Sequence, residues 1–67
     1  MILKDLIDVL AGDTHVWINY TLECGIEDSV YFVEACEVEI YQPILLDYEV
    51  KYVTFDGEGV LTIEVTQ

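Results

Sequence analysis

Residues 48–66, YEVKYVTFDGEGVLTIEVT, decide the fold of this chain. Two apolar-rich runs, 48–55 and 60–66, flank the tetrapeptide Asp56-Gly57-Glu58-Gly59, and apolar and polar side chains alternate from residue 61 to residue 66. A period of two is typical of strands, and a glycine-containing turn between two such runs predicts a β-hairpin. The second strand is expected to face inward through Leu61, Ile63 and Val65, with Val53 and Phe55 as cross-strand partners.

The residues before this hairpin predict further strands. Residues 14–22 alternate as a strand does, and residues 29–33 form a short apolar run compatible with a central strand. Residues 34–41 alternate strictly, which predicts a half-buried strand. It would place Cys36, Val38 and Ile40 on one side and Glu37, Glu39 and Tyr41 on the other. Pro43 ends this pattern because it lacks an N–H group, and residues 44–47 form a connector, with one helical turn allowed.

One helix is predicted at the N-terminus. Within residues 2–11, Leu3, Leu6, Ile7 and Leu10 have the spacing of a single helical stripe, and Gly12 provides a stop signal. A helix this short needs an apolar platform, and the sheet is the obvious one. The sequence therefore predicts one α+β domain over residues 1–67, with the N-terminal helix packed on a mainly antiparallel sheet of four to five strands.

The charge balance narrows the class of partner. Fourteen carboxylates stand against only Lys4 and Lys51, so the formal net charge is −12. Direct binding to nucleic acid requires basic side chains that displace counterions, and an anionic membrane would repel the chain. The remaining partners are proteins with basic surfaces, which include nucleic-acid-binding clefts. A hydrophobic fraction of 54% distinguishes the chain from a disordered acidic tail.

No pattern of residues indicates catalysis, a metal or a cofactor. His15 is the only histidine, and Cys24 and Cys36 match no zinc or disulfide framework, so both thiols are expected to be reduced. Asp47, Asp56 and Glu58 lack the spacing of an EF-hand. We therefore expect no catalytic residue, no metal site, no cofactor and no enzyme activity.

The chain is expected to act in the cytoplasm. Lys4, Asp5 and Asp8 interrupt what would be the apolar part of a signal peptide. No apolar run reaches the roughly 20 residues of a membrane span.

A set of acidic residues forms the candidate binding surface. On a strand over residues 34–41, Glu37 and Glu39 would share a side about 6.6 Å apart. Glu49 and Glu64 should project from neighbouring strands of the same sheet. Such rows, flanked by tyrosines, could imitate the charge of duplex DNA, which has one charge per about 1.7 Å of axis. The competing interpretation is that acidity only keeps an apolar protein in solution.

Three segments resemble small acidic proteins of phages and mobile elements in Firmicutes. They are residues 4–16, with KDLIDVL followed by Gly12-Asp13-Thr14 and Val16, residues 45–50, LLDYEV, and residues 61–65, LTIEV. The resemblance implies a phage or prophage origin. Small acidic phage proteins are often inhibitors of host nucleic-acid machinery, and anti-CRISPR proteins are the best-known group. No inhibitor motif is matched, so the resemblance assigns no functional residue.

Two functional hypotheses follow. In the first, a phage-type inhibitor docks its acidic sheet face on a basic nucleic-acid-binding groove, with a CRISPR effector as the favoured target. Its partner-binding residues would be Glu37, Glu39, Tyr41, Glu49, Tyr52 and Glu64. In the second, the chain is a non-inhibitory accessory or structural interaction module, expected to be a homodimer. Its dimer contacts would be Trp17, Tyr31 and Phe32.

Overall fold

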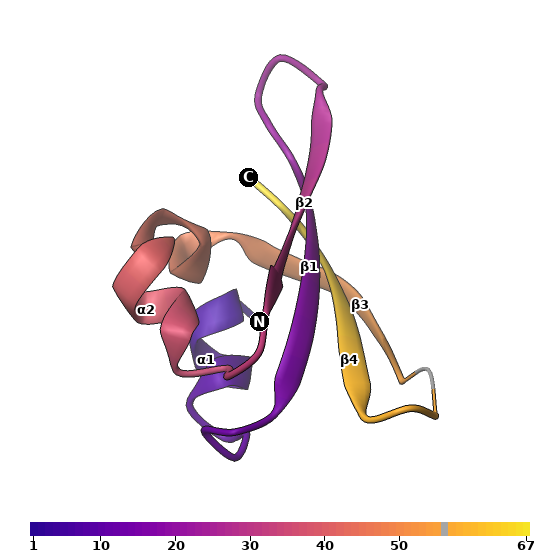
Figure 1. Ribbon diagram of the computed structural model, residues 1–67. Helices are drawn as coiled ribbons and strands as arrows, with labels where there is room; N and C mark the ends of the chain where they lie inside the picture. The colour runs from indigo at the N-terminus through magenta and orange to yellow at the C-terminus, as the bar shows by residue number, and fades with distance from the viewer. Residues whose placement is uncertain (56) are drawn as a thin grey trace.

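The computed structural model describes residues 1–55 and 57–67 and confirms the α+β class. Four strands form one sheet in the order β2-β1-β4-β3, and the helical segments gather on one side of it (Figure 1). The strands are β1 (His15–Thr21), β2 (Glu27–Phe32), β3 (Glu49–Phe55) and β4 (Val60–Thr66). The helical segments are α1 (Leu3–Ile7), α2 (Glu37–Tyr41) and the 3₁₀ helix η1 (Pro43–Asp47).

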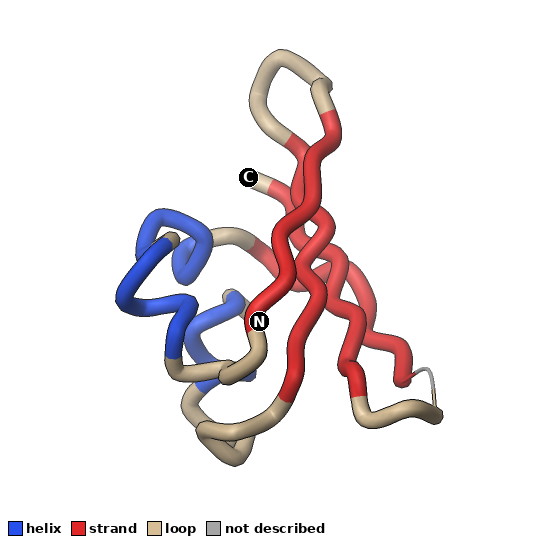
Figure 2. The backbone as a smooth tube through the Cα atoms, in the orientation of Figure 1, coloured by secondary structure: helices blue, strands red, loops and turns tan. Residues whose placement is uncertain are grey.

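The sheet is mixed. The sequential pairs β1–β2 and β3–β4 are antiparallel, as predicted, but the central pair β1–β4 is parallel. Parallel neighbours cannot be joined by a tight turn and need a crossover connection. The chain between β2 and β3 provides most of that crossover, and its helical segments lie against one face of the sheet (Figure 2).

The β-hairpin predicted over residues 48–66 is confirmed in its two strands and in their pairing register. Val53 lies opposite Ile63, and Phe55 lies opposite Leu61. In the turn, Gly57 and Gly59 have φ angles of 83° and 91°, a region that side chains with a Cβ atom rarely adopt. Asp56, the first residue of the predicted turn, lies outside the described residues.

The predicted strand over residues 34–41 is wrong, because residues 37–41 form helix α2. Val38 is fully buried, whereas Ile40, which the alternation placed on the same side, is 68% exposed. The physical reason is a second pattern in the same residues. Ala35 and Val38 are three positions apart, the spacing of neighbours on a helical face, and both are buried, as is Leu45 on the following 3₁₀ helix.

The core lies between the sheet and the helical segments. Each strand except β3 contributes at least one buried apolar side chain, and α1, α2 and η1 contribute Leu3, Val38 and Leu45. Helix α1 is shorter than the predicted 2–11, and Leu3 is its one fully buried residue; Leu6, Ile7 and Leu10 pack at the margin of the core. The buried residues are Leu3, Val16, Ile18, Phe32, Ala35, Val38, Leu45, Tyr48, Ile63 and Val65.

The two edge strands of the sheet, β2 and β3, have some of their outward-facing backbone groups already hydrogen-bonded within the chain. Of the run predicted as a central strand, residues 29–33, residues 29–32 belong to β2, which is an edge strand and not a central one. The Leu22 N–H donates to the Ile26 carbonyl at 2.9 Å, so by the antiparallel alternation the amide of Ser29 points away from β1. That N–H donates instead to Asp28 Oδ1 at 2.8 Å.

At the other edge, the N-terminal residues cover the start of β3. The Val50 N–H donates to the Met1 carbonyl, and the Leu3 N–H donates to the Tyr48 carbonyl, each at 2.8 Å. A register shift between Val50 and Tyr52 further interrupts this strand. Occupied and irregular edges of this kind hinder the addition of another strand.

Candidate functional site

One face of the sheet is left uncovered by the helical segments of the described chain (Figure 1). We call it the open face. Its residues are those that alternate with the core residues along each strand, and the pairing registers place them in adjacent rows. They are Tyr31, Ser29 and Glu27 on β2, His15, Trp17, Asn19 and Thr21 on β1, Thr62, Glu64 and Thr66 on β4, and Glu49, Tyr52 and Thr54 on β3.

An aromatic cluster occupies one end of the open face. Trp17 and Tyr31 lie opposite each other on β1 and β2, and their ring centroids are 5.7 Å apart at an interplanar angle of 66°. They remain 44% and 42% exposed. His15 Nδ1 lies 2.8 Å from the Tyr31 hydroxyl, a hydrogen bond that fixes the tyrosine ring at its outer end. Rings that are held in place and still reach solvent are well suited to contact a partner.

A polar hollow of about 380 Å³ lies beside this cluster. The short side chains of Asn19, Thr21 and Ser29 line it on β1 and β2, and Glu27 and Glu64 line it from the strands on either side of β1. Tyr20 and Asp28, which alternate with these residues along the strands, complete the lining. The surface is hollowed here because the side chains of Asn19, Thr21 and Ser29 are short, whereas the neighbouring row carries the large rings of Trp17 and Tyr31.

Tyr52 and Glu64 form a cross-strand pair next to the hollow. The Glu64 carboxylate, as a hydrogen-bond acceptor and as a negative charge, raises the pKa of the Tyr52 phenol, and partial desolvation and Glu27 add smaller effects. The neutral phenol is therefore the form that faces Glu64.

The structure separates the six predicted partner-binding residues into two groups. Glu49, Tyr52 and Glu64 lie on the open face. Strict alternation would place Glu49 and Tyr52 on opposite faces, and the register shift between Val50 and Tyr52 brings them to the same one. Glu37, Glu39 and Tyr41 lie on α2, among the helical segments that cover the opposite face. The prediction that Glu37 and Glu39 share a sheet surface with Glu49 and Glu64 is therefore wrong.

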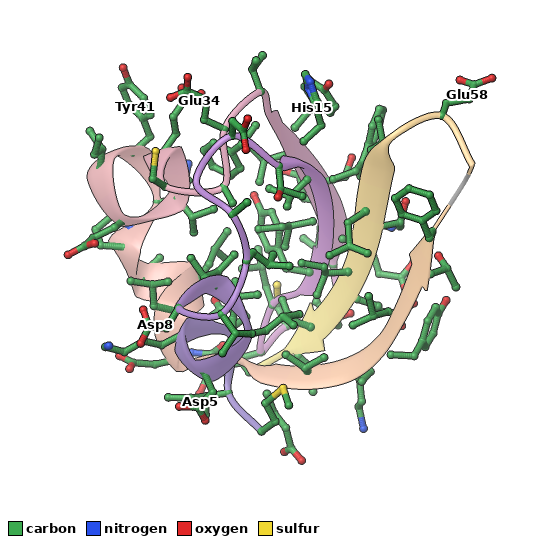
Figure 3. All side chains as sticks on the ribbon, turned by 90° about the horizontal axis from the view of Figure 1, so that it is seen from below. Asp5, Asp8, His15, Glu34, Tyr41 and Glu58 are labelled. Carbon is green, nitrogen blue, oxygen red and sulfur yellow. The ribbon has the colours of Figure 1, made fainter. Side chains whose placement is uncertain are left out.

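The helical geometry also gives the three α2 residues different surroundings. Glu37 Oε1 accepts a hydrogen bond from the Glu34 N–H at 2.9 Å, so this carboxylate is used locally. Glu39 is close enough to contribute to the raised pKa of Lys4, whose main cause is the Asp8 carboxylate. Tyr41 projects outward from α2, on the same side of the molecule as Glu34 (Figure 3).

Several residues of the open face were not among the predicted site residues. The alternation of residues 14–22 places Trp17 and Asn19 on one side of a strand, but Asn19 carries no charge that marks it as a binding residue. Trp17 and Tyr31 enter the sequence-based hypotheses only as dimer contacts, together with Phe32. The structure corrects that pairing, because Phe32 is buried in the core while Tyr31 lies on the open face.

The chemistry available elsewhere in the described chain is limited. No group of three or more metal-ligating side chains is assembled in residues 1–55 and 57–67. Partial desolvation and the nearby Glu34 carboxylate raise the pKa of the Cys36 thiol, which lowers its thiolate fraction at neutral pH and makes it a poor nucleophile. Among the same residues, no helix is long and apolar enough to cross a membrane.

Comparison of this chain with protein-family models, curated proteins and solved structures finds no match. Function is therefore inferred from the open face and the charge of the molecule.

Alkaline titration should identify the Tyr52–Glu64 pair. Because the folded state raises the pKa of Tyr52, and that of Tyr20 through burial and Asp28, both phenols should ionise above the ordinary value of about 10. Their contribution to stability is complete below the pKa of unfolded tyrosine and is lost as the pH rises through the folded-state pKa. Tyrosine ring chemical shifts followed by NMR would measure this.

Glu64→Gln should return the Tyr52 titration toward the ordinary value and leave Tyr20 unchanged, whereas Glu39→Gln should move neither. An unchanged Tyr52 titration in the Glu64 variant would contradict the pairing.

Proposed function

We propose that this protein is a non-enzymatic binding domain that docks the open face of its sheet on a basic protein surface. The observation that carries the proposal is the combination of exposed aromatic rings with carboxylates on an uncovered sheet face, in a molecule with a net charge of −12. The favoured partner is the nucleic-acid-binding groove of a host enzyme, a CRISPR effector first. The protein would then be a phage-type inhibitor that acts in the host cytoplasm.

The two kinds of residue on the open face would have different roles. Tryptophan and tyrosine provide large contact areas and are enriched among the residues that dominate binding energies. Trp17 and Tyr31 supply such an area, and Tyr52, which is 55% exposed, extends it on the same face, at the β3 edge of the sheet. Carboxylates attract a basic partner over longer distances and accelerate association at low ionic strength.

The arrangement of the layers supports the choice of this face. In the proposal the N-terminal helix packs on the opposite, core face, and the complete burial of Leu3 supports that placement. The open face then remains available for a partner while the core stays intact.

A homodimer is disfavoured by three features. Phe32 is buried, so it cannot serve as a dimer contact. Sheet extension would have to displace Asp28 at one edge and residues 1–3 at the other. Pairing two open faces would bring Glu27, Glu49 and Glu64 of both copies together, and like charges near each other destabilise a sheet surface. We therefore do not propose the dimer as the functional form.

Inhibition would result from competition for the groove. The open face would occupy the basic side chains that otherwise neutralise nucleic-acid phosphates. Because the attraction is electrostatic in large part, inhibition should weaken as salt is added, since the screening length falls from about 10 Å at 0.1 M to about 3 Å at 1 M.

A competition assay tests this function directly. Guide-loaded CRISPR effectors, bacterial RNA polymerase and a single-strand-binding protein are each mixed with fluorescently labelled DNA, and the chain is titrated in at 50 mM and at 500 mM salt. We expect it to release DNA from at least one enzyme with basic DNA contacts at low salt, and at least tenfold less effectively at high salt. If no member of the panel loses DNA at 50 mM salt, inhibition by occlusion is contradicted. Displacement that is independent of salt would contradict the electrostatic mechanism.

A further inference from the structure

The hollow on the open face has carboxylates at two of its sides but no metal-binding arrangement. Glu27 and Glu64 come from β2 and β4, which are separated by β1 and hence by about 9.6 Å, two strand spacings. A bound cation such as calcium holds its oxygen ligands at about 2.3–2.6 Å, so its ligands must converge. Among the described residues no such convergent group is present. A ligand that contacts both Glu27 and Glu64 must therefore be a positively charged group larger than a single metal ion.

We propose that the hollow receives an arginine side chain of the partner, with its guanidinium group between Glu27 and Glu64. This inference rests on the proposed docking of the open face and names the chemistry that the partner must present there. A guanidinium group is planar and carries five N–H donors, so it can bond acceptors on more than one side at once. The hollow offers carboxylates on two sides and the Asn19 amide on its floor.

The position of Glu64 supports this role. Glu64 lies opposite Tyr52 in the register of β3 and β4, on the open face and beside the hollow. Glu64 is also partly buried, so its interaction with a cation is screened less than that of a fully exposed residue.

The neighbouring aromatic cluster favours arginine over lysine. Trp17 precedes Asn19 by two residues on the same side of β1, so it belongs to the row of side chains next to the hollow. A guanidinium group stacks on aromatic rings and is weakly hydrated, whereas the ammonium group of lysine is compact and strongly hydrated. A lysine ammonium group would balance the negative charge of the hollow. It is too compact to bond Glu27 and Glu64 at the same time, and it does not stack on the neighbouring rings as a guanidinium group does.

Two synthetic peptides that differ only in arginine and lysine test the proposal. Both are capped octapeptides in which four glycines alternate with four arginines or with four lysines. Trp17 is the only tryptophan, so its fluorescence reports directly on the open face, and NMR amide shifts locate the bound peptide. We expect the arginine peptide to bind at least fivefold more tightly, with the largest shifts at Asn19, Ser29 and Glu64.

Matched variants with equal net charge separate the hollow from general acidity. Glu64→Gln and Glu39→Gln each remove one negative charge, the first at the hollow and the second on α2. We expect Glu64→Gln to weaken the arginine peptide about tenfold and to bring the two peptides close together in affinity. Glu39→Gln should change the affinity of either peptide by less than about twofold.

The possible results distinguish this inference from the proposed function. If both peptides bind the open face equally and Glu64→Gln behaves as Glu39→Gln does, the arginine site is wrong while a basic partner for the open face stands. If the shifts map to α2, or if neither peptide perturbs the open face at 20 mM salt, both proposals are overturned.

Discussion

Replacement of Val38 by aspartate is expected to unfold the domain at 25 °C, whereas the same substitution at Ile40 is expected to leave it folded. Val38 is fully buried in the core, and an unpaired carboxylate there costs several kcal/mol in addition to the lost packing. A domain of this length has a total stability of about 3–10 kcal/mol. Ile40 is 68% exposed, and a surface substitution changes stability by about 0.5 kcal/mol or less.

Circular dichroism with urea titration would measure both variants. A milder substitution, Val38→Ala, keeps the comparison quantitative if the aspartate variant cannot be purified, and it should cost about 2 kcal/mol. The test also decides between the two structures of residues 34–41. A strand would bury Val38 and Ile40 on one side, so unfolding by both aspartate substitutions would contradict helix α2.

The sequence predicted best the segments in which two neighbouring signals agree. In residues 48–66, alternating strands and a glycine turn require the same hairpin, and β3 and β4 follow it. The alternation of residues 14–22 is likewise found in β1. The parallel pairing of β1 with β4 was not predictable, because it depends on how the crossover packs and not on either strand alone.

Residues 36–41 show why a single local pattern misleads. Alternation over six residues fits a strand, but an interval of three between Ala35 and Val38 fits a helix equally well. The fold selects the helix because Val38 on α2 and Leu45 on η1 are then buried in the core, together with Ala35 just before α2. Pro43 accommodates this solution, since proline is tolerated at the first turn of a helical segment and begins η1.

The candidate site was half predictable for the same reason. The position of Glu64 follows from the alternation of β4, whereas Glu49 and Tyr52 share a face only because the register of β3 shifts between Val50 and Tyr52. Glu37 and Glu39 were added to them through the incorrect strand. The aromatic cluster and the hollow depend on the register between β1 and β2, which no local pattern in the sequence specifies.

Charge reversal on the open face is therefore expected to abolish binding, whereas an equal reversal on α2 is expected to preserve it. Glu27→Lys with Glu64→Lys and Glu37→Lys with Glu39→Lys give two double variants of equal net charge, −8 instead of −12. The first pair would place like charges against the basic partner at the centre of contact, which costs several kcal/mol. We expect its inhibitory concentration in the DNA-competition assay to rise at least 100-fold at 50 mM salt.

The α2 variant should lose only long-range attraction. Its two lysines would lie on α2, on the opposite side of the sheet from the open face and beyond the screening length of about 8 Å at physiological salt. Inhibition should therefore weaken by up to about fivefold at 50 mM salt, and this loss should be smaller at 150 mM. Amide NMR spectra of both variants control for folding, and the arginine octapeptide provides a second ligand that needs no identified enzyme. Equal losses in the two variants would show that net charge alone drives binding. A larger loss in the α2 variant would place the interface on the helical side and contradict the role of the open face.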